Sequence, residues 1–185
     1  MPTQILRPDA TISQTGMNVS PNIHAVLNDN DDNTTSNQIQ EIANYTVSFD
    51  DTSGLGSATI EKFVFSFRGV QDRRPGQTVT VTITDGAGQA YSNFTLGGSG
   101  FTTTLTTFDS SDFTTQRDGT TALNASYIDG LRVLITPSGG GHRVIEEFIT
   151  VTYAASGYSN TVAGVSSIDQ VVGVAAANIS QVAGV

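Results

Sequence analysis

The chain has 185 residues, a formal net charge of −9 and no cysteine, and it is rich in Thr (26 residues) and Gly (19 residues). The acidic balance argues against nucleic-acid binding, which needs clustered Lys and Arg, and the lack of cysteine excludes disulfides, Cys-ligated zinc and thiol chemistry. Thr packs well on a pleated surface and Gly supplies tight turns, so the composition favours strands over helices.

Residues 1–41 are polar and irregular, with Pro2, Pro8 and Pro21 and the acidic stretch LNDNDDN (27–33). We expect a weak strand followed by a loop, or an arm that becomes ordered on a partner. The segment shows neither the basic nor the apolar region of a secretory signal, so the protein is expected to be made in the cytoplasm of a host cell.

The acidic stretch is the one candidate metal site. The run Asp29-Asn30-Asp31-Asp32-Asn33 resembles the opening of a calcium loop. However, Thr34 stands where the sharp turn needs Gly, and Gln40 stands where a bidentate Glu belongs. We therefore expect a solvated loop, with no metal ion and no cofactor.

Residues 42–157 alternate between apolar and polar side chains with a period of two, which is typical of half-buried strands. TVTVTITD (78–85) directs its Val and Ile side chains to one face, and KFVFSFRGV (62–70) places three Phe on one face. Further strands are predicted at residues 44–49, 91–96, 101–108, 130–137 and 143–153.

Turn signals such as QDRRPGQ, DGAGQ and PSGGGH separate these segments. Seven or eight short strands at this spacing predict an all-β fold, an antiparallel β-sandwich of the jelly-roll type. The N-terminal arm would precede this core and an apolar tail, residues 158–185, would follow it. A short helix is allowed around SSDFTTQ (110–116) or TTALNASY (120–127).

Several motifs occur together in a set order: QILRPDA (4–10), LNDNDDN (27–33), KFVFSFRG (62–69), TVTVTITDGAG (78–88) and YIDGLRVLITP (127–137). In this order they resemble a family of jelly-roll modules of tailed-phage virion proteins and some bacterial surface proteins. The resemblance spans residues 4–154 and implies a jelly-roll building block. The aromatic residue that usually follows the opening strand is absent, and the chain has no Trp, which argues against a sugar-stacking role.

The tail contains an internal repeat. SSIDQVVGV (166–174) aligns with ANISQVAGV (177–185) at a period of eleven residues, which corresponds to three turns of an α-helix. Because Gly173 and the many Val residues weaken a continuous helix, we favour two short helical units, while an extended alternative stays open. Polar residues interrupt the apolar run, so the tail is not expected to span a membrane.

We predict that the repeated apolar side chains form an assembly interface. Short repeats ending in Gly-Val resemble C-terminal tails of other phage structural proteins, and the Gly- and Ser-containing joint AASGYSNT (154–161) suits a tethered docking peptide. The alternative is that the tail folds back onto its own sandwich. The predicted interface residues are Ile168, Val171, Val174, Ile179, Val182 and Val185.

The sequence carries no recognisable catalytic motif. His24 and His142 are far apart and neither lies in a metal-ligand spacing. Glu146 and Glu147 are adjacent in a predicted strand, so their carboxylates should face opposite sides, a poor arrangement for a catalytic pair. We therefore expect no enzymatic activity.

Two functional hypotheses remain. The first is a non-enzymatic virion structural protein of a tailed bacteriophage, in the capsid decoration or in the tail or its appendages, that assembles as a homo-oligomer and with other virion proteins. The second is a carbohydrate- or receptor-binding jelly-roll module. The repeated tail and the absence of Trp favour the first.

Overall fold

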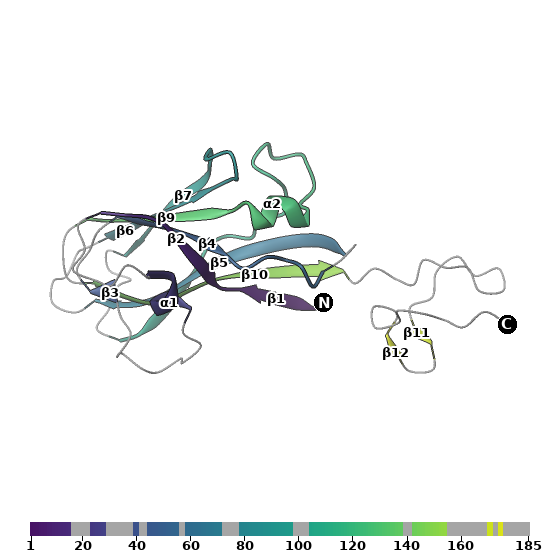
Figure 1. The fold of residues 1–185 in the computed structure, drawn as a ribbon, viewed down its shortest axis with the longest axis horizontal. Helices are drawn as coiled ribbons and strands as arrows, with labels where there is room; N and C mark the ends of the chain where they lie inside the picture. Colours follow the sequence, from purple (N-terminus) through teal and green to yellow (C-terminus); the bar gives the residue numbers. More distant parts are fainter. Residues whose placement is uncertain are drawn as a thin grey trace.

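The computed structural model of the protein describes residues 1–15, 23–28, 39–40, 44–55, 58–71, 78–97, 104–138, 142–154, 170–171 and 174–175. Within the ranges up to residue 154 the chain forms two five-stranded antiparallel sheets that pack face to face (Figure 1). The first sheet has the order β1 (Thr3–Leu6), β10 (His142–Ala154), β5 (Thr59–Gln71) and β8 (Thr106–Asp109), and β3 (Ile39–Gln40) also pairs with β10. The second has the order β2 (Pro8–Gln14), β4 (Tyr45–Phe49), β9 (Arg132–Ser138), β6 (Thr78–Thr84) and β7 (Ala90–Gly97).

The prediction of an antiparallel all-β sandwich is confirmed. Each of the seven strand segments named from the period-two pattern overlaps a strand of the structure. The two sheets contain ten strands rather than seven or eight, because the N-terminal residues contribute β1, β2 and β3. Successive strands from β4 to β6 pass from one sheet to the other, as in a jelly roll.

Residues 3–14 belong to the sandwich and do not form a separate arm. β1 pairs with β10 from Thr3↔Thr152 to Leu6↔Ile149, and β2 pairs with β4. The chain crosses from one sheet to the other at Arg7 and Pro8, and Leu6 is fully buried in the core. Backbone pairing and two buried residues, Leu6 and Pro8, hold these strands in the sheets. The two residues form too short a pattern for the apolar alternation to be recognised in the sequence.

The core lies between the sheets and follows the predicted alternation. Phe63, Phe65 and Phe67 of β5 are fully buried, and they face the apolar side chains of the second sheet. Val79, Val81 and Ile83 of β6 are also fully buried, whereas the intervening Thr side chains are half-buried. Burying a large apolar side chain contributes roughly 1.5–3 kcal/mol, so these two strands are a major source of stability.

Two short helices accompany the sheets. α1 (Ile23–Leu27) buries Ile23 and Leu27 at its two ends, and it packs on β2 and β10. α2 (Ala125–Asp129) buries Ile128 and overlaps the second of the two predicted helical segments. Neither of these described helices has the length or hydropathy needed to cross a membrane.

Four residues of the tail are described, and they are extended. β11 (Gln170–Val171) and β12 (Val174–Ala175) pair antiparallel, with Val171 opposite Val174. At these positions the favoured helical interpretation is wrong and the extended alternative holds, in keeping with the preference of β-branched Val for strands. The rest of the repeat lies outside the described residues.

Candidate functional site

A hollow of about 420 Å³ opens at one end of the sandwich, where three segments of the chain meet. One segment is the turn between β6 and β7, residues 85–87, and the second is the turn that contains Gln116. The third is α2 with the residues that flank it. Figure 1 shows the two turns side by side above α2 at the top of the molecule.

Asp85 organises the turn between β6 and β7. Its Oδ1 accepts hydrogen bonds from the backbone N–H groups of Ala87 (3.0 Å) and Gln89 (2.8 Å), and its Oδ2 lies 2.9 Å from Nε of Arg117. The hydrogen bond from Gln89 is the largest cause that lowers the pKa of Asp85, with Arg117 and Ala87 adding to it. Gly88 has a φ of 75°, a left-handed conformation that side chains disfavour. The turn predicted from DGAGQ is therefore a rigid structure with a charged carboxylate.

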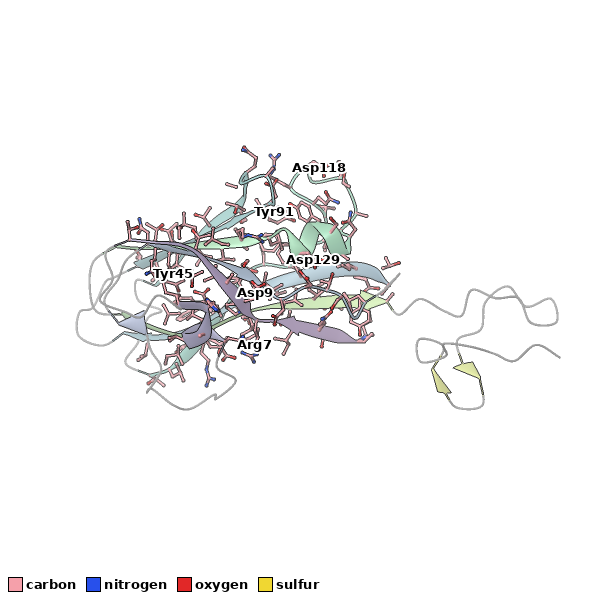
Figure 2. The ribbon with its side chains drawn as sticks, in the orientation of Figure 1. Arg7, Asp9, Tyr45, Tyr91, Asp118 and Asp129 are labelled. Atoms are coloured by element: carbon pink, nitrogen blue, oxygen red, sulfur yellow. The ribbon has the colours of Figure 1, made fainter. Side chains whose placement is uncertain are left out.

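Asp118 organises the neighbouring turn in the same manner. It accepts hydrogen bonds from the backbone N–H groups of Thr120 (2.9 Å) and Thr121 (2.8 Å) and from the Thr121 hydroxyl. These bonds, with the Thr121 hydroxyl first, lower the pKa of Asp118 to about 2. Gly119 again has a φ of 75°. Figure 2 shows Asp118 at the outer end of the molecule, above Tyr91.

α2 forms the third wall and is fixed at both ends. Asn124 caps the helix, since its Oδ1 accepts a hydrogen bond from the backbone N–H of Tyr127 (2.9 Å). Asp129 accepts hydrogen bonds from both the backbone N–H and the hydroxyl of Thr52, each at 2.8 Å. Because Thr52 is itself buried, this carboxylate anchors the helix to the end of the sandwich.

A cluster of aromatic side chains supports the hollow from below. Tyr127 lines the hollow and meets Tyr91 edge-on, with ring centroids 6.1 Å apart. Tyr91 in turn contacts Phe113 at 4.8 Å, and Phe113 stacks on the buried Phe63 at 4.8 Å. Tyr91 also donates a hydrogen bond to the carbonyl of Thr115. The wall of the hollow is thus continuous with the core.

Two glycines allow the walls to approach each other. A Cβ atom added to Gly130 would lie 3.2 Å from Cα of Gly86, and one added to Gly86 would lie 3.4 Å from Cα of Gly130. Backbone atoms cannot move away as a flexible side chain can, so a larger residue at Gly130 would push the β6–β7 turn from α2. The shape of the hollow therefore depends on this contact.

The adjacent carboxylates Glu146 and Glu147 face opposite sides of β10, as predicted, and both are buried. Glu146 lies opposite Arg68 and contacts Arg7, whereas Glu147 accepts a hydrogen bond from Tyr45 of the opposite sheet at 2.5 Å. Burial raises the pKa of Glu147 to about 8 and raises that of Tyr45 well above its usual range. The two carboxylates have different partners and do not converge on one site.

Of the predicted assembly residues, the structure describes Val171 and Val174, which pair with each other. Ile168, Ile179, Val182 and Val185 lie outside the described residues, so the interface stays a prediction. The acidic stretch Asp29–Asn33 also lies outside them. Within the described ranges, no cluster of three or more His, Asp or Glu residues could hold a metal ion.

The sequence did not reveal the residues of the hollow. Gln116, Ser126 and Tyr127 belong to segments that the pattern treats as a turn and a short helix, and they meet only through the topology of the sheets. The one available signal was the Gly-containing turn DGAGQ. His24, in contrast, has a structural role, because its ring Nδ1 lies 3.1 Å from the Thr11 hydroxyl.

No protein-family model and no curated protein matches the chain. Among solved structures, the chain is similar to the C-terminal CBM6 of LamC, a marine laminarinase from Zobellia galactanivorans. The TM-score is 0.43 and the sequence identity is 10%, over 82% of this chain and 99% of that chain. A similarity of this degree identifies neither a family nor a ligand.

Proposed function

We propose that the protein is a non-enzymatic structural component of a tailed-bacteriophage virion. The sandwich would be the rigid building block, and the repeated apolar tail would join it to other copies or to other virion proteins. The resemblance in the strand motifs and in the Gly-Val repeat supports the virion setting.

The observation that carries this proposal is that the two strands described in the tail belong to neither sheet of the sandwich. The buried core cluster of the described sandwich runs from Leu6 to Val151. β11 and β12 pair with each other and with no other described strand. We therefore expect this repeated apolar segment to contact another chain. Each Val or Ile that becomes fully buried there would contribute roughly 1.5–3 kcal/mol.

The contacts of the two buried carboxylates support a non-enzymatic role. Glu146 is paired with Arg7 and Arg68, and Glu147 is enclosed between the sheets with Tyr45. Both side chains serve the packing of the sandwich and neither opens onto the hollow. The hollow is lined by amides, hydroxyls and the Asp85 carboxylate, whose described partners are Arg117 and two backbone N–H groups rather than a nucleophile.

Truncation after Tyr158 tests the proposal. We expect a folded sandwich with an unchanged melting temperature that no longer forms assemblies, because both five-stranded sheets form without β11 and β12. Light scattering measures the assembly and calorimetry measures the stability. Ile168→Asp combined with Ile179→Asp should have the same effect in the full chain, since it places charge in an apolar contact.

The matched control is the pair of conservative changes Ile168→Val and Ile179→Val, which keeps the tail apolar and should leave assembly intact. If the tail folds back onto its own sandwich, truncation will lower the melting temperature and leave association unaltered. That result would refute the proposed role of the tail.

A further inference from the structure

We propose that the hollow between the β6–β7 turn and α2 binds a neutral saccharide the size of a mono- or disaccharide. Its volume of about 420 Å³ lies within the range of roughly 300–1,000 Å³ that is usual for small-molecule sites. Hydrogen bonds at Asp85, Asn124 and Asp129 fix the walls, so the hollow is present before any ligand arrives. This inference goes beyond the proposed assembly role and does not depend on it.

The charges around the hollow favour a neutral ligand. Asp85 is the one charged side chain of the lining, and its oxygens are already occupied by two backbone N–H groups and by Arg117. A cationic ligand would have to compete with this internal ion pair. An anionic ligand would approach a protein of net charge −9, whose field repels it. A ligand without charge avoids both costs.

The lining offers hydrogen-bond donors and acceptors that the fold leaves available at the hollow. Tyr127 accepts a hydrogen bond from the backbone N–H of Arg117 (3.0 Å), so its own hydroxyl hydrogen is directed elsewhere. Asn124 uses its Oδ1 for the helix cap and keeps its amide N–H groups for a ligand. Gln116 donates through Nε2 to the carbonyl of Ala122 (2.9 Å), which leaves its Oε1 as an acceptor. The Ser126 hydroxyl can do either.

Neighbouring hydroxyl groups of a sugar suit this arrangement. Each hydroxyl donates one hydrogen bond and accepts others, so a set of neutral donors and acceptors a few ångströms apart is its natural complement. The ring of Tyr127 adds an apolar wall for the C–H face of the sugar, and its edge-on contact with Tyr91 fixes the direction of that ring. The absence of Trp therefore limits affinity without removing the site.

An NMR titration of the full chain tests the proposal. The probes are glucose, galactose, mannose, N-acetylglucosamine, maltose and cellobiose, with glucuronate as the charged comparison. We expect at least one neutral sugar to shift the backbone amides of Gly86, Gln116 and Tyr127, with a dissociation constant of about 1 mM, a usual affinity for a ligand of this size. Glucuronate should bind more weakly than glucose.

Two variants locate the binding site. Ser126→Trp fills the hollow from an exposed position of α2 and should abolish the shifts, while Thr107→Trp, at an exposed position on β8, is the matched control and should preserve them. Tyr127→Phe keeps the ring and removes the hydroxyl, so it should weaken binding by about tenfold. The amide spectrum of each variant shows whether it is folded.

Two outcomes would overturn the proposal. One is that none of the six neutral sugars shifts the amides of the hollow at about 50 mM, well above the affinity expected for such a ligand. The other is that binding persists in Ser126→Trp, which would place the sugar elsewhere on the protein. Neither outcome affects the assembly test of the truncated chain, so the two proposals fail independently.

Discussion

The two faces of β10 each bury a glutamate, and the surroundings of the two carboxylates differ. On the outer face, Glu146 meets Nη1 of Arg7 at 2.5 Å and Nη1 of Arg68 at 3.6 Å. On the inner face, Glu147 is fully buried, accepts a hydrogen bond from Tyr45, and has no described partner for its Oε2. Both are nearly inaccessible to solvent. The two carboxylates are thus both buried and differ in the partners that surround them.

The physical reason lies in what replaces the lost hydration. Two guanidinium groups, those of Arg7 and Arg68, compensate Glu146 for part of the hydration it has lost. A single phenol cannot do the same for Glu147, and burial raises its pKa to about 8. At neutral pH the inner carboxyl therefore carries a proton, and the sandwich interior holds a neutral acid.

The largest expected effect is a dependence of stability on pH. Because the folded pKa of Glu147 is about 8 and its usual value is 4.5, the folded state binds the proton more tightly than the unfolded state. The contribution of this group is fully present below about pH 4.5 and is lost as the pH rises through 8. The loss is a few kcal/mol, with an upper bound of about 5 kcal/mol. Urea denaturation at a series of pH values measures it.

Glu147→Gln is the matched control for this effect. Gln is similar in shape and cannot ionise, so the variant should lack the decline between pH 5 and pH 8 that we expect of the wild-type chain. The difference between the two curves isolates this one group from the other titrating side chains. Two parallel curves would show that Glu147 is not the buried neutral acid described above.

The next effect is on the outer face. Glu146→Gln removes the charge that pairs with Arg7 and Arg68, and should lower the free energy of unfolding by about 1–2 kcal/mol at neutral pH. The effect is moderate because both arginine side chains retain some exposure to solvent. Added salt should reduce the difference only slightly, since the pair is largely buried. An unchanged stability would contradict the assigned role of this pair.

The smallest effect is expected at an exposed ion pair on the same sheet. Lys62 Nζ lies 2.7 Å from Oδ2 of Asp112, but the two side chains are 35% and 54% exposed. Asp112→Asn should therefore change the free energy of unfolding by less than about 1 kcal/mol. If Asp112→Asn lowered the free energy of unfolding as much as Glu146→Gln, solvent exposure would not explain the difference between the two ion pairs. Thermal denaturation of both variants side by side makes the comparison.

The sequence predicted the strands that alternate and missed the features that depend on distant partners. Val79, Val81 and Ile83 were assigned correctly because a period of two is visible within one segment. Glu147 was not recognised as buried, because its environment includes Tyr45 of the other sheet and a register shift between Val144 and Glu146. No pattern within a single strand contains that information.

The candidate site illustrates the same limit. The turn at DGAGQ was predicted, since Gly and Asp favour tight turns, but nothing in it identifies α2 as its neighbour. Gly86 and Gly130 approach each other closely, although β7 and β8 separate them in the sequence. The extended conformation at residues 170–171 and 174–175 was the second of two alternatives, because an eleven-residue repeat is compatible with both a helix and paired strands.

The pairing of β1 with β10 also determines when the domain can be completed during synthesis. Thr3 pairs with Thr152, and β10 lies between β1 and β5 in its sheet. β1 must therefore wait for β10 before it can pair, and the long strand β5 has an open edge until then. Contacts so distant in the chain slow folding, and an open edge can pair with another nascent chain. This protein is therefore most exposed to misassembly while β10 has not yet been synthesised.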